Sequence, residues 1–242
     1  MLEGESRRPV QPGDLAPDFT LPLVSEEGQV SLARYRGRSP LLLAINRGLW
    51  CSFCRRYVAQ LAATRERLHQ LGVDTLVIVA SDPERARFYL RHRPSKVPVA
   101  ADPGRITHRA YGLPNPPLTL ELEETLKAMR VEIEKTAVTA NDLAELRSAA
   151  QKIEATPIDR TEAAVELPLW DFIFMQRRLY PYELTESEQR EWNVTLGTAQ
   201  FLIDREGVVQ WTKVQGTSGP LGGLGNFASQ AELVAAAQTV TG

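Results

Sequence analysis

The chain has 242 residues, of which 43% are hydrophobic and 24% are charged, and its formal net charge is −2. These values are typical of a globular protein that buries a core in one enlarged domain, or in one domain and a smaller one. The near-neutral charge and the lack of a long basic run in the sequence argue against a nucleic-acid partner.

The N-terminal segment has no apolar stretch of the length found in signal peptides. Residues 1–15 combine glycine, proline and charge without periodicity, so we expect a mobile leader there. Fully apolar runs reach only the length of Leu41–Ile45, which is far too short to cross a bilayer. We therefore expect no membrane contact and a cytoplasmic location.

The first half of the chain alternates between strand-like and helix-like segments. Short strands are expected within residues 17–24 and 28–32, and the apolar run in 39–46 is typical of a buried central strand. A helical period then begins after residue 51 and ends at Gly72.

The same alternation continues to residue 113. A buried strand is expected in residues 73–81, a helix from Asp82 with Pro83 at its first position, a short strand in 97–102 and a short helix in 103–113. The order strand–helix, repeated three times from residue 40, predicts a mainly parallel sheet covered on both faces.

The C-terminal segment begins with two strands around the turn Asp204–Gly207, which is a hairpin signal. The glycine-rich loop that follows lacks the lysine and the spacing of a nucleotide-binding loop. A last helix is expected after Ser229, because Glu232 completes a capping box.

Residues 114–195 differ in character, and we expect a helical insertion. One amphipathic stripe consists of Leu122, Leu126, Met129, Ile133 and Ala137. The segment 167–183 is dense in aromatic residues and apolar around more than one helical face. It could be a helix packed between the domain and the insertion, a homodimer interface, or a cover over the cysteines.

Both cysteines of the chain, Cys51 and Cys54, lie at the junction of a predicted strand and a predicted helix. The first turn of a helix presents free N–H groups and the positive end of the dipole, which stabilise a thiolate. Arg47, Arg55 and Arg56 lie nearby in sequence, so we expect a thiol pKa well below about 8.5 and a nucleophile at neutral pH.

Two other uses of the pair are weaker. Zinc favours four ligands, and His69, His92 and His108 do not follow at finger-like spacing. Two inert, buried cysteines would not need the strand–CxxC–helix context, which is typical of redox sites. We therefore expect no metal and no cofactor, and we expect His108 at the surface or the edge of the core.

The stretch Trp50-Cys51-Ser-Phe-Cys54 resembles the active site of the thioredoxin fold. The stretches "GDLAPDFTLPLV", "VPVAADPGRITHRAYGL" and "FLIDREGVVQW" resemble peroxiredoxins of the alkyl hydroperoxide reductase and thiol-specific antioxidant family, and "RGLWCSFC" is similar to its CxxC-containing branch. The resemblance implies an α/β, thioredoxin-like and peroxiredoxin-like mixed sheet flanked by helices over residues 16–113 and 196–242. It also implies an antioxidant role.

The two halves of the resemblance imply different attacking cysteines. The peroxiredoxin pattern aligns its reactive cysteine with Cys54, whereas the thioredoxin pattern assigns attack to Cys51, which we favour. The loop in which relatives carry a cis-proline or an arginine holds Thr198 and Ala199 instead. Arg47 is our candidate for the missing positive charge.

Three functions remain open. The first is a dithiol–disulfide oxidoreductase that uses Cys51 and Cys54, with Trp50, Arg47 and Arg55 lining the site, and is regenerated by a reducing thiol protein or a small thiol. The second is a thiol peroxidase that reduces hydroperoxides with Cys54 as the attacking residue. The third is a non-catalytic binding module that keeps only the fold.

Overall fold

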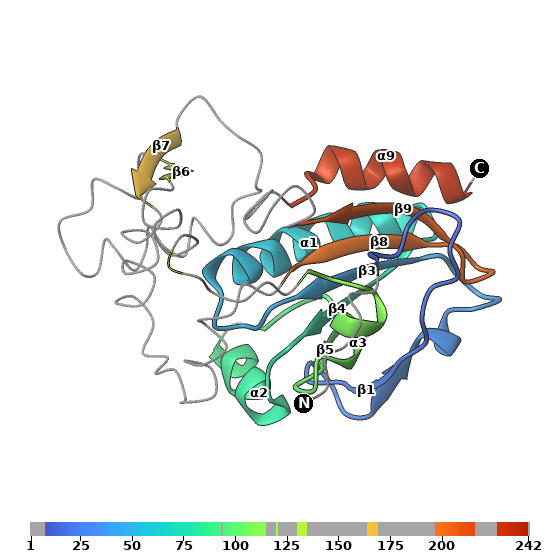
Figure 1. Ribbon diagram of the computed structural model, residues 1–242, viewed down its shortest axis with the longest axis horizontal. Helices are drawn as coiled ribbons and strands as arrows, with labels where there is room; N and C mark the ends of the chain where they lie inside the picture. The colour runs from blue at the N-terminus through green and yellow to red at the C-terminus, as the bar shows by residue number, and fades with distance from the viewer. Residues whose placement is uncertain are drawn as a thin grey trace.

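A five-stranded mixed sheet in the order β5-β4-β3-β8-β9 forms the centre of the fold (Figure 1). The computed structural model describes residues 8–92, 94–114, 120, 130–134, 164–168, 197–215 and 227–241. The five strands are β3 (Leu41–Asn46), β4 (Asp74–Val79), β5 (Val99–Ala101), β8 (Ala199–Ile203) and β9 (Val209–Val214).

The sheet combines a parallel half and an antiparallel half. Strands β3, β4 and β5 are parallel, and α1 (Ser52–Gln70) and α2 (Pro83–His92) connect them. Strand β8 runs antiparallel to β3 on its other side and carries β9 outward. The predicted strand–helix order is confirmed, and the central strand β3 is paired along both edges.

Two layers cover the sheet, and the alternation of side chains along β3 shows why. Leu42 and Ala44 pack in a core cluster with residues of α1, α2 and α9 (Gln230–Thr241). Leu41, Leu43 and Ile45 pack on the opposite face. That second face is covered by α3 (Ile106–Ala110), η1 (Leu32–Arg34) and the pair β1 (Thr20–Pro22) and β2 (Gln29–Ser31).

The turn and cap residues act as the sequence predicts. The Asp82 carboxylate accepts a hydrogen bond from the Glu84 N–H at 2.9 Å at the start of α2. Ser229 and Glu232 form the predicted capping box of α9, with bonds of 2.8 and 3.2 Å. Gly72 follows α1 at φ 74°, in the left-handed region that glycine enters most easily.

Residues 8–15, expected to belong to a mobile leader, are instead held against the domain. The Val10 N–H donates to the Tyr111 carbonyl at 3.1 Å, and the Gly13 N–H donates to the Val209 carbonyl at 2.8 Å. The Val10 side chain is buried in the core. The apolar Val10 therefore outweighs the loop-like composition around it, and residues 1–7 lie outside the described residues.

Apart from Leu120, which is helical, the described elements of the insertion are two strands rather than helices. Strand β6 (Arg130–Glu134) pairs antiparallel with β7 (Ala164–Pro168), so Ile133 does not lie on a helical stripe. In β6 the β-branched residues alternate with glutamates, and this period of two favours a strand over a helix. The predicted helices elsewhere in 114–195, and the homodimer interface proposed there, fall outside the described residues.

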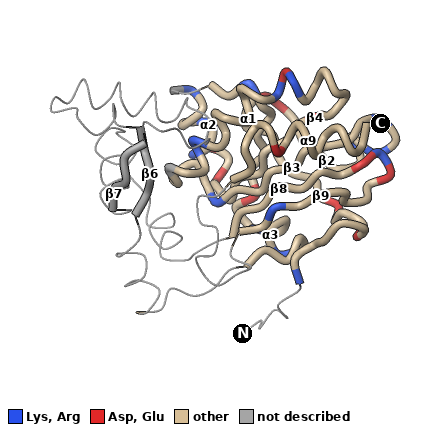
Figure 2. Tube along the Cα trace, turned by 90° about the horizontal axis from the view of Figure 1, so that it is seen from above, with Lys and Arg blue, Asp and Glu red and all other residues tan. Residues whose placement is uncertain are grey.

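Charge is kept away from the central strands. Figure 2 shows that β3 and β8 carry no Lys, Arg, Asp or Glu, whereas such residues lie on helices and at turns. Among the residues that the structure describes, no helix has the length and apolar character needed to span a bilayer.

Candidate functional site

The two cysteines lie where β3 leads into α1, as the sequence predicts. Cys51 is the N-cap of α1, with extended dihedrals of φ −82° and ψ 118°. Its N–H donates to the Gly48 carbonyl at 3.1 Å, and its carbonyl accepts from the Arg55 N–H at 3.0 Å. These two backbone bonds fix Cys51 at the positive end of the helix.

Both cysteines are reduced and buried, but not equally. Cys51 is 6% exposed and Cys54 is 0% exposed. Both pack with the buried Trp50 and the partly buried Phe53 in one apolar cluster. Trp50 and Phe53 therefore shield both sulfurs, and Cys51 is the more exposed of the two.

The Cys51 thiol is the more acidic of the two. A hydrogen bond from the Cys54 thiol is the largest influence, and it lowers the pKa of Cys51 to about 6 against the opposing effect of burial. The positive charge of Arg47, the backbone N–H of Cys54 and the charge of Arg55 lower it further. All of these groups favour the thiolate, so Cys51 is ionised at neutral pH.

The Cys54 thiol shows the opposite behaviour. Burial is the main cause that raises the pKa of Cys54 well above its ordinary value. Its hydrogen bond to Cys51 and the negative charge of Cys51 act in the same direction, while Arg47 opposes them through its charge and its backbone N–H. One proton is thus held on Cys54 and directed at the Cys51 sulfur.

Arg55 is built into the wall of the site. It is only 6% exposed, and its Nη1 donates to the Leu49 carbonyl at 3.3 Å. Its guanidinium also lies 5.6 Å from the centroid of the Tyr89 ring on α2. These contacts hold a positive charge beside the cysteines and tie the loop before Cys51 to two helices.

Buried polar side chains gather at the same end of the sheet. Ala199 pairs with Ile45 in the antiparallel pair of β3 and β8. The residue before it, Thr198, therefore lies opposite Asn46 at the end of β3. Asn46 is 0% and Thr198 is 2% exposed, and neither side chain has a hydrogen-bond partner among the described residues. The sequence analysis selected Thr198 and Ala199 but missed Asn46. A single amide side chain at the end of the apolar run Leu41–Ile45 could have indicated it.

His108 is a second correction, because it is buried rather than at the surface or the edge of the core. The side chain is 4% exposed, and neither ring nitrogen makes a hydrogen bond of ordinary geometry within the described residues. Burial lowers the pKa of His108 to about 4, against the opposing charge of Asp102. The imidazole is therefore neutral at pH 7 and lies beside the main chain of Asn46.

Gly48 and Ser81 support the cysteine loop, and sequence reasoning missed both. The Ser81 hydroxyl accepts a hydrogen bond from the Leu49 N–H at 3.1 Å. A Cβ added at Gly48 would lie 2.6 Å from Trp50 Cδ1 and 2.9 Å from Ser81 Oγ. Only glycine leaves room for the Trp50 indole at this point.

Replacing Gly48 by alanine should therefore destabilise the site. Trp50 and Ser81 are both buried, so relieving the overlap moves packed groups and costs about 1–3 kcal/mol. Urea unfolding measures the loss. Gly104→Ala is the matched control, because a Cβ there meets nothing closer than 3.5 Å. Equal unfolding midpoints for the two variants would contradict this packing.

The described residues contain no group of three or more His, Cys, Asp or Glu side chains that could hold a metal ion. The site itself presents one acidic thiol, one protonated thiol and two nearby cations, Arg47 and Arg55.

Comparison with known proteins identifies a family and a fold for the chain. The model of the AhpC/TSA family matches residues 12–137. A candidate thiol:disulfide interchange protein DsbE from Chlorobium tepidum is 16% identical, with a TM-score of 0.50 and coverage of 96% of this chain and 99% of that chain. Peroxidoxin BcpB from Mycobacterium tuberculosis is 10% identical, with a TM-score of 0.51 and 96% coverage of each chain. Both share the thioredoxin-like fold; no curated protein sequence matches with significance.

Proposed function

Because the chain belongs to the AhpC/TSA family, a family of thiol-dependent redox proteins, we propose that it is a dithiol–disulfide oxidoreductase in which Cys51 attacks and Cys54 resolves. One observation carries the proposal: the two thiols are driven to opposite protonation states by the same contact. Cys51 is the thiolate at neutral pH, and Cys54 is the thiol that donates to it.

The proposed cycle has two exchange steps. The Cys51 thiolate attacks one sulfur of a substrate disulfide, forms a mixed disulfide and expels the first substrate thiolate. Cys54 then gives up its proton and attacks the Cys51 sulfur, which expels the second substrate thiolate and closes the Cys51–Cys54 disulfide. The substrate gains two electrons from the pair, one proton from Cys54 and a second proton from the solvent. A reducing thiol protein or a small thiol, as found in the cytoplasm, restores the pair by two further exchanges.

The alternative with Cys54 as the attacking residue of a peroxidase receives less support. A peroxidatic cysteine attacks as a thiolate, yet Cys54 is 0% exposed and its pKa is raised. The acidic Cys51 also argues against a binding module with inert thiols. Hydroperoxide reduction that starts at Cys51 uses the same thiolate, and it differs only in forming a sulfenic acid that Cys54 converts to the disulfide with release of water.

Turnover on two substrate classes tests the proposal. The wild-type protein, with a thiol reductant in excess, should reduce a small disulfide catalytically and should do so faster than it reduces hydrogen peroxide. Hydroperoxide turnover that clearly exceeds disulfide turnover would replace the proposal by a thiol peroxidase. Failure of both reactions in the folded protein would favour the binding module.

Arg47 offers a test of the charge that favours the thiolate. Replacing it by methionine keeps an unbranched side chain and the backbone N–H but removes the positive charge, so the pKa of Cys51 should rise by roughly 1 pH unit. The absorbance of the thiolate at about 240 nm, recorded as a function of pH, measures the change in the pKa of Cys51. Arg67→Met, at an exposed position in the last turn of α1, is the control. An unchanged pKa in Arg47→Met would exclude this role.

A further inference from the structure

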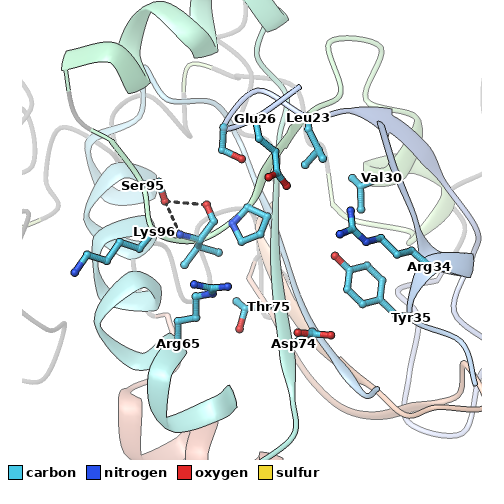
Figure 3. Close-up of a pocket in the computed structure, with 13 residues that line it drawn as sticks. Leu23, Glu26, Val30, Arg34, Tyr35, Arg65, Asp74, Thr75, Ser95 and Lys96 are labelled. Atoms are coloured by element: carbon cyan, nitrogen blue, oxygen red, sulfur yellow. Dashed lines mark hydrogen bonds between the residues drawn. The ribbon is translucent and has the colours of Figure 1, made fainter. Parts of the chain in front are cut away.

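A cavity of about 390 Å³ lies at the end of the sheet opposite the cysteines (Figure 3). It exists because β5 is shorter than β4: β5 pairs only with residues from Val77 to Val79, so the first residues of β4 have no strand on that edge. The loop between β1 and β2, the segment after β2, helix α1 and the residues before β5 enclose the space.

The floor of the cavity presents hydrogen-bonding groups without partners. Thr75 lines the cavity and is 4% exposed, and its hydroxyl has no partner among the described residues. The Val77 N–H donates to the Pro98 carbonyl at 3.0 Å. Alternate residues of a strand direct their N–H groups to the same side, so the Thr75 N–H also points to this edge, where no strand receives it. Buried donors of this kind are normally satisfied.

Charged side chains of both signs line the cavity. Arg34, Arg65 and Lys96 line the cavity, and within the part of the chain that the structure describes none of their side chains forms a hydrogen bond or an ion pair. Figure 3 shows the guanidinium groups of Arg34 and Arg65 entering from different sides, while the Lys96 side chain is directed away. Of the two lining carboxylates, Asp74 already accepts a bond from the Ser39 hydroxyl at 2.6 Å.

We propose that this cavity binds a small organic anion that carries carboxylate or phosphate groups. Guanidinium groups match both groups with paired hydrogen bonds, and the Thr75 N–H and hydroxyl supply further donors. The volume falls within the range of small-molecule sites. Among the described residues that line this cavity, only Thr75 presents an unpaired strand N–H to it, which is too little for an added peptide strand.

The anion site is separate from the redox chemistry. Thr75 pairs with Leu42, so four residue steps separate it from Asn46 at the other end of β3, which at about 3.3 Å per residue is roughly 13 Å. A ligand at Thr75 therefore does not contact Cys51. This proposal does not depend on the redox proposal, and the variant Cys51→Ser should bind the anion as the wild type does.

Calorimetric titration with inorganic pyrophosphate and with citrate, at constant ionic strength, tests the site. We expect saturable binding of at least one probe to one site, with a Kd of about 1 mM or tighter. Arg65→Gln and Thr75→Val should each weaken binding about tenfold, since each removes a donor to a charged group. Glu26→Gln should tighten binding, because the Glu26 carboxylate lines the cavity and repels an anion.

Arg67→Gln is the matched control for Arg65→Gln, because Arg67 is exposed on the same helix and does not line the cavity. A preference for pyrophosphate would indicate a phosphorylated ligand, and a preference for citrate a carboxylated one. The proposal is overturned if neither probe binds at about 10 mM, or if binding is equal in wild type, Arg65→Gln and Thr75→Val. Weaker binding in Glu26→Gln would also contradict it.

Discussion

Replacing Cys51 by serine is expected to lower disulfide reduction by about three orders of magnitude or more, because a serine hydroxyl is not ionised at neutral pH. Replacing Cys54 by serine should instead stop the cycle one step later. Cys51 would then attack once and remain bound to half of the substrate. Serine keeps an O–H donor where the Cys54 thiol donates to the Cys51 sulfur, so the Cys51 thiolate should remain stabilised and should still make this single attack at pH 7.

An aromatic disulfide that releases a coloured thiolate distinguishes the two variants. Cys54→Ser should release one equivalent and then stop, with the second half found by mass spectrometry on Cys51. Cys51→Ser should release almost none over the same time. Each variant serves as the control for the other, since both replace sulfur by oxygen in the same cluster. A rapid adduct on Cys54 in the Cys51→Ser protein would reverse the proposed order of attack.

Acid should destabilise the protein through His108. The folded state holds this histidine with a pKa of about 4, while the unfolded chain has its ordinary value of 6.5. The unfolded state therefore binds the additional proton first as pH falls. The stabilisation is fully present above pH 6.5 and is lost between pH 6.5 and pH 4, at a cost of about 3 kcal/mol in the free energy of unfolding.

Urea unfolding at several pH values between 4.5 and 7 measures this effect. His108→Gln cannot titrate, so its stability should fall less steeply with acid than that of the wild type. His69→Gln is the matched control, because His69 is exposed in the last turn of α1. Parallel pH profiles for wild type and His108→Gln would show that the histidine is not held neutral by the fold.

Much of the frame could be predicted because its signals are local. The apolar run of β3, the helical period after Cys51 and the cap at Asp82 each act within a few residues. The position of Cys51 at the start of α1 followed from the same signals. A lowered pKa of Cys51 could also be predicted, because the helix start and Arg47 and Arg55 are close to it in sequence. The largest cause, the hydrogen bond from the Cys54 thiol, was not predicted.

Other features depend on residues far apart in the chain. Gly48 is essential because of Ser81, and Asn46 faces Thr198 only through the pairing of β3 with β8. The burial of His108 depends on how α3 covers the sheet. Met129, Ile133 and Ala137 are spaced as on one face of a helix, whereas the residues of β6 alternate as in a strand. Pairing with β7 stabilises the strand.

The most direct test of the account is the rate of alkylation of each cysteine by iodoacetamide as a function of pH, with the modified residue identified by mass spectrometry. We expect that Cys51 is modified first and that the rate of its alkylation rises with pH with a midpoint near pH 6. The same protein in denaturant should show a midpoint near about 8.5 for both thiols. Modification of Cys54 before Cys51, or a midpoint at about 8.5 for Cys51 in the folded protein, would contradict the assignment of Cys51 as the acidic, attacking thiol.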